Sequence, residues 1–158
     1  MKPGRALDLA CGFGKNALWL TELGWRVTAV DNSAAAIESL QGRVAEARVA
    51  DLEKGEFRIQ PASWDLIVIA YYLQRDLFEP ARRGLIPGGM LIAITLLGET
   101  HERFRLQPGE LARYFEGDEI LHSHEGAPTG ETHHKLVSEI VARRMLECRS
   151  RLGRSSNC

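Results

Sequence analysis

The stretch ALDLACGFGKNALWLTELGWRVTAVDNS, residues 6–33, changes its pattern twice within a short length. An apolar run over residues 5–10 is interrupted at once by Gly12 and Gly14. Residues 16–23 then carry apolar side chains at helical spacing, and residues 26–30 are rich in β-branched types. These periods predict a strand, a glycine turn, a helix and a second strand.

The alternation of strand and helix continues downstream and then gives way to paired strands. We expect a helix from Ser33 to about Gly42, strands over 44–50, 64–70 and 90–96, and a helix over 77–85, with a turn at Pro87–Gly89 before the last strand. A short helix over 108–115 and a hairpin of strands 119–124 and 136–142 follow. The pattern predicts an α/β fold, a Rossmann-like, doubly wound and mostly parallel seven-stranded sheet with a C-terminal antiparallel hairpin.

Composition excludes several classes of protein. The 158 residues include 20 basic and 21 acidic ones, which opposes a nucleic-acid or anionic-membrane partner. Cys11, Cys148 and Cys158 are too far apart for a disulfide framework or a zinc site, which favours a reducing, cytoplasmic location. No apolar run approaches about 20 residues, and the N-terminus lacks a signal-peptide core. We expect one domain over residues 1–149 and a disordered tail over 150–158.

Acidic residues end two of the predicted strands next to the glycine turn. In an open parallel sheet, ligands bind beyond the carboxyl ends of the strands. Asp31 lies at the tip of the strand beside the glycine turn, where a carboxylate can accept hydrogen bonds from both hydroxyls of a ribose. Asp51 lies one strand further out and is placed to accept from the amino group of an adenine ring. The sequence therefore predicts a nucleoside site.

The glycine turn also allows a dinucleotide reading, because Gly12 to Ala17 fits the pattern G-x-G-x-x-A. Asp8 opposes this reading, since a carboxylate inside the preceding strand repels a pyrophosphate and attracts a sulfonium or an amino group. The chain also has no length for a second, catalytic domain. An NAD-dependent oxidoreductase is therefore kept as the lesser alternative.

The whole motif resembles the first cofactor motif of class I S-adenosylmethionine-dependent methyltransferases, with Ala10 where the family usually has its first glycine. The segments VADLE (49–53), WDLIVIAYYLQR (64–75) and LIPGGMLIAIT (85–95) are similar to the later motifs of the family. The order and spacing of the pieces make the resemblance more specific than any one of them. LQPGELARYF (106–115) followed by HSHEG (122–126) resembles the small-molecule branch that includes tellurite-resistance methyltransferases.

This resemblance implies a cofactor site, with S-adenosyl-L-methionine as the cofactor. The methionine part would lie among Asp8, Ala10, Cys11, Gly12 and Gly14. The ribose would lie at Asp31, the adenine at Asn32, Asp51 and Leu52, and the sulfonium above Ala70 and Tyr71.

The implied activity is transfer of a methyl group to a small-molecule acceptor by in-line displacement, which depends mainly on orientation. No general base is identified from the sequence. Tyr71, Tyr72 and Arg75 follow the fourth strand and are the candidates to face the acceptor. The alternative is that both tyrosines only pack their rings and keep their hydroxyls in water.

Histidines on the predicted hairpin suggest a metal site, but we expect none. His122 and His124 share one face of a strand, and His133 and His134 lie on the connection near Glu125 and Glu131. No cysteine or carboxylate completes a recognisable ligand spacing, so a polar edge-strand role is favoured, with a place in the acceptor pocket left open. The arginines after residue 142 are interpreted as solvated charge.

The first predicted strand begins close to residue 1, whereas relatives carry lid helices before it. The lid helices are therefore expected to be absent. The sequence leaves three explanations: an open site, a site covered by a homo-oligomer or another partner, or a protein that starts upstream. A second function follows from this, a cofactor-binding but catalytically weak regulatory or partner subunit.

Overall fold

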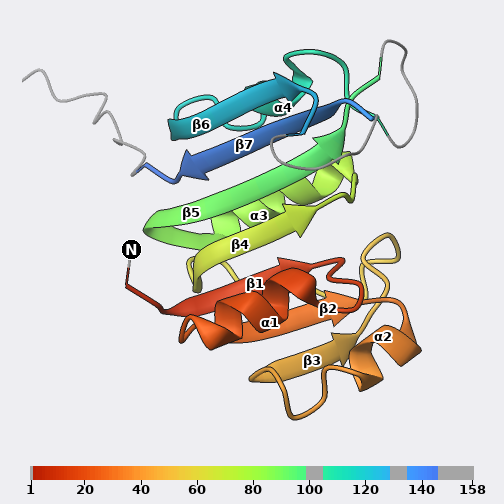
Figure 1. Cartoon of the computed structure of the whole chain (residues 1–158). Coiled ribbons are helices and arrows are strands. Elements are labelled where there is room, and N and C mark those ends of the chain that lie inside the picture. Colours follow the sequence, from red (N-terminus) through yellow and green to blue (C-terminus); the bar gives the residue numbers. More distant parts are fainter. Residues whose placement is uncertain (1, 99–104, 129–134, 146–158) are drawn as a thin grey trace, which may run out of the picture.

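The computed structural model describes residues 2–98, 105–128 and 135–145, and these form one seven-stranded sheet flanked by helices (Figure 1). The strands are β1 (Arg5–Leu9), β2 (Arg26–Asp31), β3 (Glu46–Val49), β4 (Trp64–Ala70), β5 (Leu85–Leu96), β6 (Glu119–Gly126) and β7 (Val137–Arg143). The helices are α1 (Lys15–Glu22), α2 (Ala34–Glu38), the 3-10 helix η1 (Arg75–Leu77), α3 (Phe78–Gly84) and α4 (Glu110–Arg113).

The strand order is β3-β2-β1-β4-β5-β7-β6. The pairs from β3 to β5 are parallel, whereas β7 is antiparallel to both β5 and β6. The predicted fold class is therefore confirmed, including the C-terminal hairpin at one edge of the sheet.

Some element boundaries differ from those predicted. The segment Pro87–Gly89 lies inside β5. Trp64 of β4 pairs with Leu85, and the next pair in the ladder is Leu66 with Met90. The extra residues bulge out of the ladder, which a Pro-Gly-Gly segment tolerates because proline donates no backbone hydrogen bond. The helix after Ser33 ends at Glu38, and the chain then continues as turns. So short a helix lacks the tertiary packing that would extend it.

Two apolar clusters cover the two faces of the sheet. Leu7 and Leu9 of β1 pack in one cluster with Phe78 of α3, while Ala6 packs in the other with Leu20 of α1. Successive residues of a strand point to opposite faces, so this division places helices on both sides. The domain is therefore doubly wound, as predicted.

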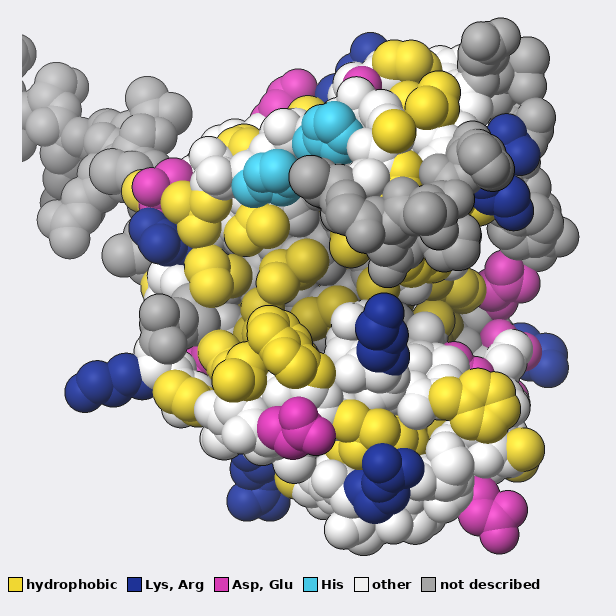
Figure 2. All heavy atoms as spheres, viewed as in Figure 1, with side chains coloured by type: hydrophobic (Ala, Val, Ile, Leu, Met, Phe, Trp, Pro, Cys, Tyr) yellow, Lys and Arg dark blue, Asp and Glu magenta, His cyan; other side chains and the backbone are white. Residues whose placement is uncertain are grey.

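The two faces are not covered equally. Residues of both α3 and α4 join the cluster on one face, whereas α1 and α2 cover mainly β1 to β3 on the other. On that second face, Met90 and Ile92 of β5 are only partly buried. Figure 2 shows hydrophobic side chains gathered there in a hollow between α1 and the histidines of the hairpin.

The sheet brings the carboxyl ends of β1 to β4 to one edge. From β1 the chain runs to β2 and β3 on one side of the sheet, and it then returns to β4 on the other side of β1. The direction of strand order therefore reverses between β1 and β4. Such a switch point opens a crevice between the connections that leave neighbouring strands in opposite directions. Within the described ranges, no helix has the length and apolarity to cross a membrane.

Candidate functional site

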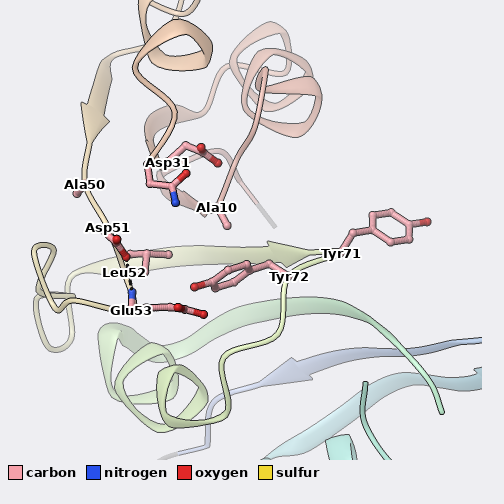
Figure 3. A pocket seen from close by; sticks show the side chains of 9 residues that line it. Ala10, Asp31, Ala50, Asp51, Leu52, Glu53, Tyr71 and Tyr72 are labelled. Atoms are coloured by element: carbon pink, nitrogen blue, oxygen red, sulfur yellow. Dashed lines mark hydrogen bonds between the residues drawn. The ribbon is translucent and has the colours of Figure 1, made fainter. Parts of the chain in front are cut away.

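A cleft of about 320 Å³ lies at this switch point (Figure 3). Its lining residues are Ala10, Asp31, Asn32, Ala50, Asp51, Leu52, Glu53, Tyr71 and Tyr72. They come from the ends of β1, β2, β3 and β4. Three of these side chains are carboxylates, and none of the lining residues is a lysine, arginine or histidine. The cleft therefore favours a ligand with positive charge.

The glycine turn lies against Asp31. The amide of Gly12 donates to Asp31 Oδ2 at 2.8 Å, and the amide of Cys11 donates to the Val30 carbonyl at 3.0 Å. Gly12 has φ of 54°, and a Cβ at this position would enter open space, which a ligand can use. Gly14 has φ of 77°, and a Cβ there would lie 2.5 Å from a methyl of Leu40. Gly12 adopts its φ without the strain that a side chain adds, and Gly14 also avoids a close contact with Leu40.

Asp31 is held by a second hydrogen bond, because the amide of Ser33 donates to its Oδ1 at 2.9 Å. Ser33 in turn caps α2 by accepting from the amide of Ala36. Each oxygen of Asp31 thus already accepts one backbone hydrogen bond and keeps a lone pair for a ligand. This carboxylate joins the glycine turn, the end of β2 and the start of α2.

Asp8 does not line the cleft; it is buried in β1, near Asp31 and the amide of Ala17 in α1. It is 1% exposed, and neither carboxylate oxygen accepts a well-formed hydrogen bond within the described part of the chain. Burial raises the pKa of Asp8 to about 7; the nearby Ala17 amide lowers it and the charge of Asp31 raises it. A buried carboxylate with so little compensation is costly, and such groups are concentrated at functional sites.

Cys11 is adjacent to these carboxylates and is not a nucleophile at neutral pH. Burial, with the charges of Asp8 and Asp31, raises the pKa of the Cys11 thiol to about 12. Its sulfur lies 3.4 Å from the Gly12 carbonyl. The side chain therefore remains a neutral thiol, and it packs against the apolar cluster that includes Ala17 and Leu20 of α1.

Left-handed backbone occurs at two non-glycine residues of the cleft. Ala10 has φ of 53° and Tyr71 has φ of 57°. They follow β1 and β4, which are neighbours in the sheet. This conformation costs roughly 1–2 kcal/mol for a residue with a side chain, and it persists where surrounding contacts impose it. Strain is thus stored on both sides of the switch point.

The strain at Ala10 gives a first prediction. Ala10→Gly should raise the free energy of unfolding by about 0.5–1 kcal/mol, because glycine adopts this φ freely and loses only part of the gain to unfolded-chain entropy. Urea unfolding measures the change. Ala17→Gly in α1 is the control and should destabilise. A loss of stability in Ala10→Gly would show that its backbone is unstrained.

Asp51 shapes its own turn. Its Oδ1 accepts from the amides of Glu53 and Lys54 at 3.0 and 3.3 Å, and its Oδ2 lies 3.0 Å from the ammonium of Lys54. The hydrogen bond from Lys54 lowers the pKa of the Asp51 carboxyl from its ordinary value. This turn presents Leu52 and Glu53 to the cleft.

The three candidates after β4 occupy different environments. Figure 3 shows the ring of Tyr72 pointing towards Leu52 and Glu53, whereas the ring of Tyr71 points away from them. Tyr71 is 51% exposed. Burial and surrounding carboxylates raise the pKa of the Tyr72 phenol, which stays protonated and donates to Gln74. Arg75 does not line the cleft; its guanidinium binds Glu110 of α4.

The structure thus brings together part of the residue set selected from the sequence. Ala10, Asp31, Asn32, Asp51, Leu52, Tyr71 and Tyr72 line the cleft, whereas Asp8, Cys11, Gly12, Gly14, Ala70 and Arg75 do not. Sequence reasoning missed Ala50 and Glu53. Both belong to the segment VADLE, and their position beside Asp51 and Leu52 was the available signal.

The histidines of β6 lie away from this cleft. His122 Nε2 is 3.5 Å from Glu139, and His124 Nε2 is 2.9 Å from the Ala127 carbonyl. Among the described residues, no three His, Cys, Asp or Glu side chains are grouped to hold a metal ion. His133, His134, Glu131 and the chain after residue 145 lie outside the described residues.

A doubly wound sheet with a cleft at its switch point defines an α/β domain of the class that binds ligands beyond the carboxyl ends of its strands. The family model described as "Methyltransferase domain" matches residues 6–89, more than half of the chain, so the chain belongs to this family. The predicted family is confirmed.

Solved structures share the fold. TehB from Haemophilus influenzae superposes with a TM-score of 0.77 and 22% sequence identity, over 91% of this chain and 58% of TehB. The 1,6-didemethyltoxoflavin-N1-methyltransferase of Burkholderia thailandensis, solved with 1,6-didemethyltoxoflavin and S-adenosylhomocysteine bound, has a TM-score of 0.68 and 18% identity, over 91% and 72%. The fold is therefore that of class I S-adenosylmethionine-dependent methyltransferases.

A sequence relative matches a shorter stretch. Ribosomal RNA small subunit methyltransferase C from Alcanivorax borkumensis is 40% identical in an alignment of 52 residues that covers 27% of this chain and 16% of that protein. The chain thus spans a small part of this relative and 58% of TehB.

Proposed function

We propose that this protein binds S-adenosyl-L-methionine in the acidic cleft and transfers its methyl group to a small-molecule acceptor. One observation carries the proposal: three carboxylates and no cationic residue line the cleft, with Lys54 beside one of them, Asp51, and a fourth carboxylate, Asp8, is buried in β1 near Asp31. A sulfonium nucleoside is attracted by this charge, whereas a dinucleotide pyrophosphate is repelled.

The residues present fit the parts of such a cofactor. Asp31 would accept the ribose hydroxyls, and the turn made by Asp51 would place Leu52 and Glu53 beside the adenine. The open space at Gly12 would admit the methionine part, and the charge of Asp8 would attract its sulfonium. The cofactor supplies an activated methyl group, and the protein's task is to orient donor and acceptor.

The small-molecule acceptor is supported by one structural neighbour and by the charge of the cleft. The Burkholderia enzyme was solved with 1,6-didemethyltoxoflavin and S-adenosylhomocysteine bound, and it shares the fold of this chain. The acidic lining and a net charge of -1 oppose a polyanionic acceptor such as ribosomal RNA.

Calorimetry and turnover together test the proposal. We expect S-adenosylhomocysteine to bind at micromolar concentration and NAD not to bind. Methyl transfer is then assayed with thiol, selenite, tellurite and halide acceptors. Turnover of one acceptor supports the proposal. Binding without turnover supports the alternative of a regulatory or partner subunit, and binding of NAD alone supports an oxidoreductase.

A further inference from the structure

The segment that follows β4 supports the wall of the cleft through its side chains. The Tyr72 hydroxyl donates to Gln74 Oε1 at 2.9 Å, and Gln74 Nε2 donates to the carbonyl of Leu52 at 3.3 Å. At its start, the amide of Tyr71 donates to the Ile94 carbonyl at 2.6 Å. Residues 71–74 therefore hold Leu52 from one side while their own backbone begins in a strained conformation.

Arg75 anchors the other end of this segment to α4. Its Nε lies 2.6 Å from Glu110 Oε1, its Nη2 lies 3.3 Å from Glu110 Oε2, and Nη2 also donates to the Arg105 carbonyl at 2.9 Å. The side chains of Arg75 and Glu110 are 31% and 14% exposed. A bidentate ion pair of this kind fixes the orientation of the two side chains as well as the distance between them.

The partner of Arg75 is itself fixed to the rest of the domain. Glu110 Oε2 accepts from the amide of Gln107 at 2.9 Å. The neighbouring Gly109 donates to both oxygens of Glu125 in β6, at 2.8 and 3.1 Å, and Ser138 of β7 donates to the same carboxylate. The anchor point is thus tied to the hairpin rather than to the cleft.

We infer that Arg75 is a positioning residue, which holds residues 71–74 against Leu52 by fastening them to α4. The left-handed backbone of Tyr71 requires contacts on both sides to persist. Removal of the Arg75 anchor frees one side, so Tyr72 and Gln74 lose their fixed place beside the cleft. This role rests on the proposed function only in that the cleft is taken to bind the cofactor.

The chain offers a matched control in the ion pair of Arg82 and Asp118. Arg82 Nε lies 2.6 Å from Asp118 Oδ2, and the two side chains are 14% and 2% exposed. Asp118 also accepts from the amide of Met145 at 3.1 Å. This pair ties α3 to the segment between α4 and β6, and it is more buried than the pair of Arg75 and Glu110. Neither Arg82 nor Asp118 lines the cleft.

Loss of the Arg82 pair should therefore have the larger effect on stability, and loss of the Arg75 pair the larger effect on ligand binding. Arg82→Ala should lower the free energy of unfolding more than Arg75→Ala, because it leaves Asp118 buried without its cation. Arg75→Ala should weaken binding of S-adenosylhomocysteine about tenfold and accelerate amide hydrogen exchange at residues 71–74, whereas Arg82→Ala should leave both unchanged. Arg75→Lys keeps the charge and should restore part of both losses.

Calorimetric affinity, urea unfolding and hydrogen exchange are measured on the full chain for all three variants. The inference is overturned by unchanged exchange at residues 71–74 in Arg75→Ala, or by equal losses of affinity in Arg75→Ala and Arg82→Ala. If the unaltered protein does not bind S-adenosylhomocysteine, the proposed function fails, and the exchange comparison still decides the role of Arg75.

Discussion

Asp31→Ala should weaken binding of S-adenosylhomocysteine by a hundredfold or more. Hydrogen bonds to a charged acceptor contribute roughly 1.5–3 kcal/mol each, and two such bonds to a ribose account for this loss. The structure adds a second reason. Because Asp31 also accepts from the amides of Gly12 and Ser33, its removal loosens the glycine turn that lies beside the same ligand. Isothermal titration calorimetry measures the change.

Asp65→Ala is the matched control for this variant. Asp65 Oδ2 also accepts a backbone hydrogen bond, from Arg5 at 2.8 Å, but it lies at the amino end of β4, away from the cleft. Both variants should remain folded by circular dichroism, and only Asp31→Ala should lose affinity. Unchanged affinity in Asp31→Ala would remove this carboxylate from the ligand site.

The fold could be predicted because its signals are local. In residues 6–33, the change from strand to helix period and the two glycines appear directly in the sequence, and parallel strands buried on both faces give continuous apolar runs such as residues 64–70. The exact ends of α2 and α4 could not be predicted, since helices of one turn depend on tertiary packing more than on propensity.

The candidate site was predictable to the extent that it lies at strand ends. The sequence predicts Asp31 and Asp51 as site residues because each follows a predicted strand, and both line the cleft. Glu53 was missed because its position depends on a turn in which its own amide donates a hydrogen bond to the Asp51 carboxylate. The nearness of Arg75 to β4 in sequence predicts a place at the acceptor, but the direction of its side chain is set by Glu110, 35 residues further along the chain. No local pattern encodes such a pair.

The buried carboxylate of Asp8 should make stability depend on pH. Its pKa is about 7 in the folded protein and 3.8 as the ordinary value, so the folded state binds more protons between these values. The free energy of unfolding therefore falls as pH rises from about 4 to about 7 and levels off above, by roughly 4 kcal/mol from this group. In Asp8→Asn this fall should be absent. Urea unfolding at pH 4 to 8 measures it, with Asp65→Asn as the control for net charge.

The same carboxylate should discriminate between the charged and the neutral form of the cofactor. S-adenosylmethionine carries a sulfonium that S-adenosylhomocysteine lacks, so the affinity ratio of the two should rise as Asp8 ionises near pH 7. The ratio cancels effects of pH on the contacts that both ligands make in the same way, such as those to the ribose and the adenine. In Asp8→Asn the ratio should be the same at pH 6 and pH 8. A ratio that rises equally in Asp8→Asn would show that another group supplies the charge, and Asp8 would then be a buried structural residue that the fold tolerates.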